Sequence, residues 1–216
     1  MRRTGRRPLV MGSMAPRSAL LFGATISFLG LLYLDLWVNP LSMLIAGLTS
    51  LTYLFAYTPL KRINPLCTLV GAIPGAASPL IGWAASTGRL DREAWVLYAL
   101  LFLWQFPHFM AIAWMYRDDY ERAGYRVLPG NKHRRLFAAA HAVIPAVLLI
   151  PVILLPWIGK QAGNFYLGGA ICLGVGFALL AIRFGRKTTN RAARRLLFAS
   201  IIYLPAIFLF LLLNKR

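Results

Sequence analysis

Acidic side chains are scarce in this sequence: six Asp and Glu residues stand against 24 Lys and Arg residues in 216 positions. Polar stretches are scarce too, since 59% of the residues are hydrophobic and 14% are charged. In a soluble globular domain, roughly half of the residues are apolar and about a quarter are charged. The composition therefore excludes an ordinary soluble domain and indicates long apolar segments that lie in a lipid bilayer.

Several sequence motifs are absent, and each absence argues against one type of site, targeting segment or fold. Cys67 and Cys172 stand alone in apolar segments, so no Cys-x-x-Cys pair supports a zinc or thioredoxin-like site. The basic start runs into Pro8, Gly12 and Pro16 instead of a short apolar core with a cleavage site, which argues against a signal peptide. Alternating strands of about ten residues, typical of a membrane β-barrel, are missing. We therefore expect one all-α membrane domain over residues 1–216.

Seven apolar segments are long enough to cross a bilayer as helices, which takes about 20 residues. Segments such as 146–157 and 204–213 are apolar on every side, unlike a soluble helix with one apolar stripe. Gly and Pro residues between 71 and 82 predict that the third helix is kinked and packed inside the bundle. The predicted spans are about 18–36, 40–60, 66–86, 93–115, 135–157, 164–183 and 195–213.

The distribution of basic residues predicts the orientation. Nineteen of the 24 Lys and Arg residues lie in the N-terminal segment and in the 2–3, 4–5 and 6–7 loops, which share one side. Positively charged loops stay on the cytoplasmic side, so we expect these loops and the N-terminus to be cytoplasmic in a cell (inner) membrane. In a soluble protein, a net charge of +18 would suggest nucleic acid. Here topology explains the charge, and we expect a lipid bilayer and no nucleic acid as partner.

Two polar groups on the predicted cytoplasmic side could bind a phosphorylated ligand. Tyr57 and Lys61 are four residues apart, so they would share a helix face; interfacial anchoring is the alternative explanation. Asp118, Asp119 and Glu121 are half of all the acids in the chain. A carboxylate cluster suits Mg²⁺, which shares its ligands with substrate phosphates. The alternative is a solvated loop in which arginines balance the acids.

A third polar group lies inside the fourth apolar segment, where Gln105 and His108 flank Pro107. Ionisable groups at membrane depth are costly and often functional, and a proline kinks the helix around them. A packing histidine whose hydrogen bonds are satisfied is the alternative. Taken together, cations, carboxylates and an apolar interior predict a site for a polyprenyl diphosphate with Mg²⁺.

Five stretches of the sequence resemble the UbiA-type intramembrane prenyltransferases, most closely the branch that farnesylates haem B. The most specific part is Pro-His-Phe at 107–109, followed by the Asp-Tyr loop. The five stretches are residues 1–9, 57–62, 71–88, 104–114 and 116–129.

The resemblance implies an all-α UbiA-type helical bundle that transfers a farnesyl group from farnesyl diphosphate to a vinyl group of haem B, which gives haem O. It also implies a link to haem A synthase. Tyr57 and Lys61 would be catalytic, and Asp118, Asp119 and Glu121 would hold Mg²⁺, with Asp119 the best match to the family's second metal motif. The residues that would bind substrate are Arg3, Arg7, Lys61, Arg62, Gln105 and His108.

The sequence departs from the family in one respect. Family members have nine spans and an earlier metal motif of one Asn and two Asp. We therefore expect a chain without the first two helices and with little transferase activity of its own. Two other functions stay open: a UbiA-type enzyme that acts on a quinone precursor or chlorophyllide, and a small transporter. A transporter would carry polar groups along both halves of the membrane.

Overall fold

A computed structural model describes residue 5 and residues 7–214. Within these residues, seven helical segments are long and apolar enough to cross a membrane, which confirms the predicted integral membrane protein and its seven spans. The elements in chain order are α1 (Pro16–Trp37), α2 (Pro40–Leu51), the π-helical η2 (Thr52–Tyr57), α3 (Thr58–Leu60), α4 (Cys67–Gly75), α5 (Ser78–Thr87), α6 (Arg92–Met115), α7 (Arg117–Arg122), α8 (Asn131–Ile158), α9 (Asn164–Lys187) and α10 (Asn190–Leu213).

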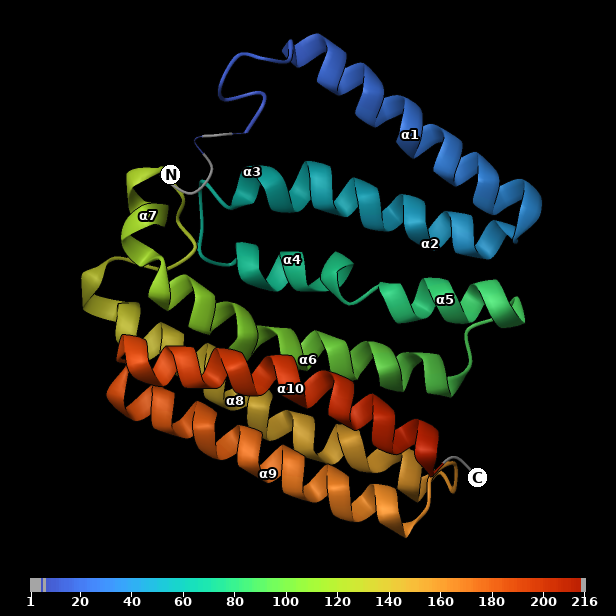
Figure 1. The fold of residues 1–216 in the computed structure, drawn as a ribbon, viewed down its shortest axis with the longest axis vertical. Helices are drawn as coiled ribbons and strands as arrows, with labels where there is room; N and C mark the ends of the chain where they lie inside the picture. Colours follow the sequence, from blue (N-terminus) through green and yellow to red (C-terminus); the bar gives the residue numbers. More distant parts are fainter. Residues whose placement is uncertain (1–4, 6, 215–216) are drawn as a thin grey trace.

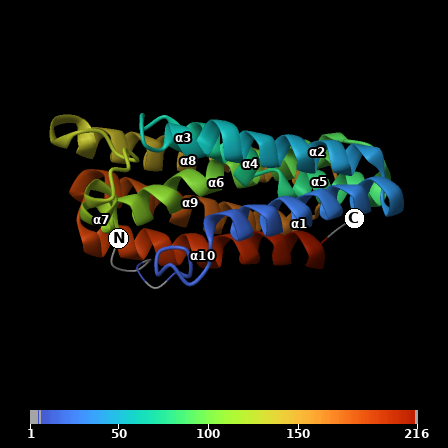
Figure 2. The ribbon, with the colours of Figure 1, turned by 90° about the horizontal axis from the view of Figure 1, so that it is seen from above.

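The bundle has two parts (Figures 1 and 2). α6, α8, α9 and α10 pack on one another around an apolar core whose large, fully buried side chains include Leu149, Tyr166, Phe184 and Ile207. α4 and α5 pack on α6 of this four-helix part, α2 packs on α5, and α1 packs on α2 at the outer edge (Figure 1). None of the α1 side chains is buried. The buried core therefore lies mainly in the four-helix part, and α1 is exposed along its length.

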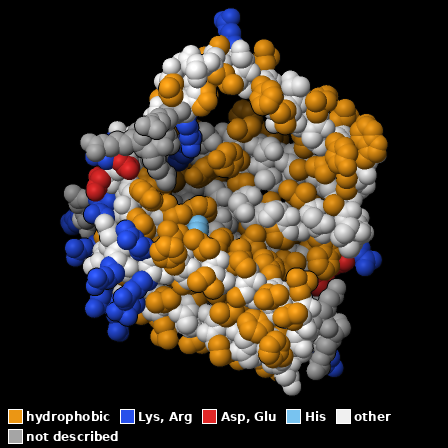
Figure 3. Space-filling view, in the orientation of Figure 1, with side chains coloured by type: hydrophobic (Ala, Val, Ile, Leu, Met, Phe, Trp, Pro, Cys, Tyr) orange, Lys and Arg blue, Asp and Glu red, His pale blue; other side chains and the backbone are white. Residues whose placement is uncertain are grey.

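One end of the bundle collects most of the charge. α3, α7 and the starts of α4, α8 and α10 lie at this end, which we call the basic end (Figure 1). Lys and Arg side chains gather there (Figure 3). α10 begins at Asn190, earlier than the predicted 195, because the Thr189 side chain accepts a hydrogen bond from the Ala192 N–H and caps the helix.

The third span, which the sequence predicts to be kinked, is divided into two helices. α4 ends at Gly75 and α5 begins at Ser78, with Ala76 and Ala77 between them. Pro79 has no N–H and cannot continue the hydrogen-bond ladder of α4, so the helix restarts with this proline in its first turn. In contrast, α6 continues through Pro107 without interruption.

The second span is irregular near its end. Residues 52–57 form a π-helical segment, and the Thr58 N–H bonds to the carbonyl of Tyr53, five residues earlier. The Thr58 hydroxyl donates to the same carbonyl at 2.8 Å. Pro59 follows and lacks the N–H of a regular turn. A π-bulge shifts the helix register by one residue, and such bulges are frequent at functional sites.

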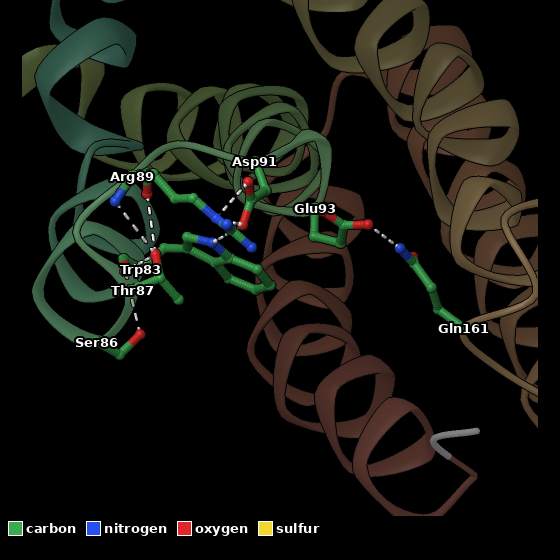
Figure 4. A network of polar contacts seen from close by, with 7 residues as sticks. All are labelled: Trp83, Ser86, Thr87, Arg89, Asp91, Glu93 and Gln161. Atoms are coloured by element: carbon green, nitrogen blue, oxygen red, sulfur yellow. Dashed lines mark hydrogen bonds and ion pairs between the residues drawn. The ribbon is translucent and has the colours of Figure 1, made fainter.

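A polar network holds the end opposite the basic end (Figure 4). Asp91, which precedes α6, accepts hydrogen bonds from Arg89 Nε at 3.0 Å and from Trp83 Nε1 at 3.4 Å. Glu93 accepts a hydrogen bond from Gln161 in the α8–α9 connection. Two of the six acids thus tie helix ends together far from the basic end.

Candidate active site

A cavity of about 790 Å³ opens between α1, the second span, α4, α6 and α7. Figure 3 shows the hollow in this face of the molecule, below α1. Its two cations, Arg7 and Lys61, come from the basic end, and its other lining residues are a mixture of apolar side chains, tyrosines and hydroxyl groups. Its lining includes Arg7, Ser27, Thr49, Ser50, Tyr53, Leu54, Tyr57, Lys61, Cys67, Thr68, Pro74, Phe109, Ile112, Tyr120 and Tyr125.

Lys61 lies between two aromatic rings at the mouth of this cavity. Its Nζ is 5.7 Å from the ring centroid of Tyr57 and 5.2 Å from that of Tyr125. The Lys61 N–H bonds to the Tyr57 carbonyl at 3.1 Å, so the four-residue spacing does bring both side chains to one face. Among the described residues, Lys61 forms no ion pair with a carboxylate. Its ammonium group is therefore held by aromatic rings and open to an anionic ligand.

Two glycines of α4 give the site its close packing. A Cβ atom at Gly71 would lie 2.6 Å from Tyr57 Cδ2, and one at Gly75 would lie 2.4 Å from Gln105 Oε1. Gln105 is buried and donates from Nε2 to the Ala72 carbonyl at 2.9 Å. The structure thus uses Gln105, a predicted substrate contact, to join α6 to α4, and Gln105 is not among the residues that line the cavity.

The three acids of α7 each face an arginine. Asp119 pairs with Arg122, and Glu121 pairs with Arg134. The Asp118 side chain is 71% exposed and lies 3.7 Å from Arg117. Within the described residues, His, Cys, Asp and Glu side chains form no group of three or more that could hold a metal ion. The three carboxylates therefore do not converge as a ready-made cluster, although α7 also carries Tyr120, which lines the cavity.

His108 lies on a different face of α6 from the cavity wall. Its Nδ1 is 2.8 Å from Ser200 Oγ in α10, and its ring stacks on Trp104 at a centroid distance of 4.8 Å. Trp104 Nε1 also donates to the Ser200 carbonyl at 2.9 Å. On its other side, His108 makes an edge contact with Phe109, which lines the cavity. His108 thus adjoins the cavity through the Phe109 ring.

The hydrogen bonds around His108 favour one tautomer. Ser200 Oγ donates its one proton to the Leu197 carbonyl at 2.6 Å. When the Ser200 proton lies toward Leu197, the 2.8 Å contact between Ser200 and His108 is made by a proton on Nδ1. A neutral imidazole protonated on Nδ1 carries its lone pair on Nε2, and within the described residues Nε2 forms no hydrogen bond that would compete with a metal or a proton.

The predicted arginines divide into three cases. Arg7 lines the cavity. Arg62 is exposed, and its guanidinium carbon lies 5.9 Å from the Tyr125 ring centroid, at the edge of the mouth. Arg3 lies outside the described residues. The sequence reasoning missed Tyr125 and Ser200, since both are distant in the chain from the residues they contact and neither belongs to a local pattern.

Comparison with known proteins supplies the family context. The model of the UbiA prenyltransferase family matches residues 1–202. A protoheme IX farnesyltransferase of Solibacter usitatus is 46% identical over 215 residues, which covers 100% of this chain and 74% of that protein. Another, from Koribacter versatilis, is 42% identical over 222 residues and is covered to 72%.

One solved structure is similar in fold. It is a chain described as digeranylgeranylglyceryl phosphate synthase in membranes, with a TM-score of 0.77 and 21% identity. The match covers 98% of this chain and 74% of that one. At this identity the likeness shows the arrangement of helices alone. This chain therefore spans about three quarters of the length of the proteins it resembles.

Proposed function

Because this chain belongs to the UbiA prenyltransferase family, we propose that it transfers the farnesyl group of farnesyl diphosphate to a vinyl group of haem B and thereby forms haem O. The observation that carries this proposal is the cavity with a cationic mouth and apolar walls. Relatives named protoheme IX farnesyltransferase, 42–46% identical over the whole chain, supply the choice of substrates.

The cavity suits a lipid diphosphate as donor. Small-molecule sites are mostly apolar clefts of about 300–1,000 Å³ with a few polar groups that fix orientation, and this cavity of about 790 Å³ lies in that range. Lys61 and Arg7 would bind the diphosphate oxygens at the mouth, with Arg62 and Arg3 as further candidates from the sequence. Leu54 and Phe109 would contact the isoprenoid chain deeper in the bundle.

The reaction would begin when the allylic carbon–oxygen bond breaks and its electron pair leaves with the diphosphate. Lys61 would stabilise the growing negative charge, and electrostatic stabilisation of this kind is usually the largest catalytic contribution. The face of the Tyr57 ring would stabilise the allylic cation. That cation would add to the vinyl group of haem B. Water would then add to the new cation and lose a proton, which completes the hydroxyethylfarnesyl group.

A metal ion, Mg²⁺ by the sequence prediction, would be shared with the substrate. Mg²⁺ is usually bound by one or two carboxylates together with substrate phosphates, so it does not require a cluster of three acids. Asp119 and Asp118 would supply these carboxylates, with Glu121 as the third candidate, and the ion would replace their present pairing with arginines. When bound, the ion would neutralise the charge of the leaving diphosphate.

His108 would bind the acceptor. Its lone pair on Nε2 is the form that an axial haem ligand requires, and Ser200 is the outer partner that orients such a histidine. The edge contact with Phe109 puts His108 next to the cavity for the farnesyl chain. A haem held by His108 would therefore lie beside the donor.

The proposed location is the inner membrane of the cell, with the basic end in the cytoplasm. The gathering of Lys and Arg at that end supports this orientation. In this arrangement a water-soluble diphosphate product leaves to the cytoplasm, and haem O stays in the bilayer for a haem A synthase.

The test is an assay for haem O in membranes that contain the protein expressed from its complete reading frame. We expect Lys61→Ala to lower haem O formation at limiting farnesyl diphosphate by at least about tenfold, since it removes a charge-assisted contact of about 1.5–3 kcal/mol. Lys132→Ala removes an exposed cation that does not line the cavity and should behave as the wild type. A prenylated quinone precursor or chlorophyllide in place of haem O would refute the choice of acceptor. Substrate transport without any transfer would refute an enzyme.

A further inference from the structure

Two arginine-lined recesses adjoin one another at the basic end, apart from the cavity described above. The first, of about 590 Å³, is lined by Arg117, Arg134 and Arg135 together with Trp114 and residues 188–190. The second, of about 480 Å³, is lined by Arg191, Arg194, Arg195 and Phe198 on α10. Asn190 lines both recesses. Each recess therefore presents three guanidinium groups, and the two are neighbours.

Arg117 is fixed in position before any ligand binds. Its Nη1 donates to the Trp114 carbonyl at 2.8 Å and to Asn190 Oδ1 at 2.9 Å. Its guanidinium carbon lies 5.3 Å from the Trp114 ring centroid. These contacts join α6 to the start of α10 and hold the fork of the guanidinium in one geometry. A guanidinium fork held in this way is suited to bidentate recognition of a phosphate.

The recesses hold more positive charge than the protein itself neutralises. Glu121 pairs with Arg134, and Asp118 lies 3.7 Å from Arg117 while being largely exposed. In the described part of the chain, Arg135 and the three α10 arginines have no carboxylate partner within 4 Å. Topology alone requires basic residues on this side of the membrane, but it does not require them to line a concave surface.

The recesses lie at the level of lipid headgroups. Residues 196–213 of α10 are mostly apolar and rise about 27 Å along the helix axis, close to the roughly 30 Å of a hydrocarbon core. Arg194 and Arg195 come directly before this stretch. Next to the arginines, Phe198 is 61% exposed and Leu136 is 73% exposed. Cations thus lie directly above apolar side chains that could contact acyl chains.

We propose that the two recesses bind an anionic phospholipid with two phosphates, of the cardiolipin type, with one phosphate in each recess. Each of the two phosphates would bind the three arginines of one recess. The acyl chains would contact the exposed side chains of Leu136 and Phe198. Basic pockets between membrane helices on the cytoplasmic side are suited to such headgroups. The recesses are separate from the donor cavity, because no residue that lines the cavity lines either recess.

The experiment compares lipid retention by protein expressed from its complete reading frame and purified in detergent, with native mass spectrometry as the readout. The probes are cardiolipin and phosphatidylcholine at equal concentration. Arg135→Gln/Arg195→Gln removes one exposed arginine from each recess. Arg126→Gln/Lys132→Gln removes two exposed cations at the same end that line neither recess. Circular dichroism of both variants reports whether the fold is intact.

We expect the wild type and the control variant to retain cardiolipin in preference to phosphatidylcholine. The recess variant should bind cardiolipin about 25-fold more weakly, since each surface arginine contributes about fivefold. The proposal would be overturned if the wild type retained both lipids equally, or if the recess variant and the control variant lost the same amount of bound cardiolipin. Displacement of the lipid by inorganic phosphate would instead indicate a free-anion site. A raised KM for haem in the recess variant would indicate a site for the acceptor's carboxylates. Either result would also overturn it.

Discussion

Substitution of Ser200 by alanine tests whether His108 binds haem through Nε2. In the wild type, Ser200 Oγ lies 2.8 Å from His108 Nδ1 and itself donates to the Leu197 carbonyl. Ser200→Ala removes the group that keeps the proton on Nδ1 and fixes the ring. Loss of such an outer partner typically lowers metal affinity by about 10–100-fold, or about 1.4–2.7 kcal/mol. We therefore expect the KM for haem to rise about tenfold or more.

The assay measures the KM for each substrate separately, together with the shift of the Soret band when haem is added to purified protein. The KM for farnesyl diphosphate should not change, because Ser200 does not line the donor cavity. Ser86→Ala is the matched control, since its exposed hydroxyl bonds only to the Trp83 carbonyl of its own helix. If Ser200→Ala left haem binding unchanged while His108→Ala abolished it, the tautomer argument would be wrong. An equal rise in the KM for haem and in the KM for farnesyl diphosphate would instead indicate damage to the α6–α10 packing.

Two further predictions concern the donor cavity. Gly71→Ala should lower kcat at least about tenfold, because the new Cβ would lie 2.6 Å from Tyr57 and push its ring away from the site. Gly82→Ala, which meets nothing within 4 Å, should keep full activity and raise stability by up to about 1 kcal/mol, so an equal loss in both variants would contradict the steric argument. Tyr125→Leu should raise the KM for farnesyl diphosphate about threefold to tenfold. It removes a cation–π interaction of about 0.5–1.5 kcal/mol that positions the Lys61 ammonium group. Tyr125→Phe keeps the ring and should restore the wild-type KM, and failure to do so would point to the hydroxyl.

Patterns within a single segment predicted much of this protein. Length and all-round hydrophobicity predicted seven spans, and the described part of the chain has seven. Proline and glycine in the third segment predicted a kink, and the structure divides this span between Gly75 and Ser78. The four-residue spacing of Tyr57 and Lys61 predicted a shared face, and the cation lies near that ring. Each of these features depends on residues that are close together along one helix, and the order of residues in the chain shows which ones these are.

Contacts between segments could not be read from the sequence in the same way. The sequence marks His108 and Gln105 as polar groups in one apolar helix, but it does not say that His108 faces Ser200 and that Gln105 faces Ala72. It also does not pair Tyr125 with Lys61. These outcomes depend on how each helix is rotated about its own axis. That rotation is set by side-chain packing across the bundle, where residues far apart in the chain meet.

The acids of α7 illustrate the same division. Composition alone identifies them, because acids are rare here and three lie within four positions. Two of their partners, Arg117 and Arg122, belong to the same short helix, whereas Arg134 belongs to the first turn of α8. The sequence by itself thus determined the membrane spans, the charge asymmetry and the residue types available for chemistry, because these follow from local composition and periodicity. Only the tertiary structure decided which of those residues share the cavity, since long-range packing orients each helix face.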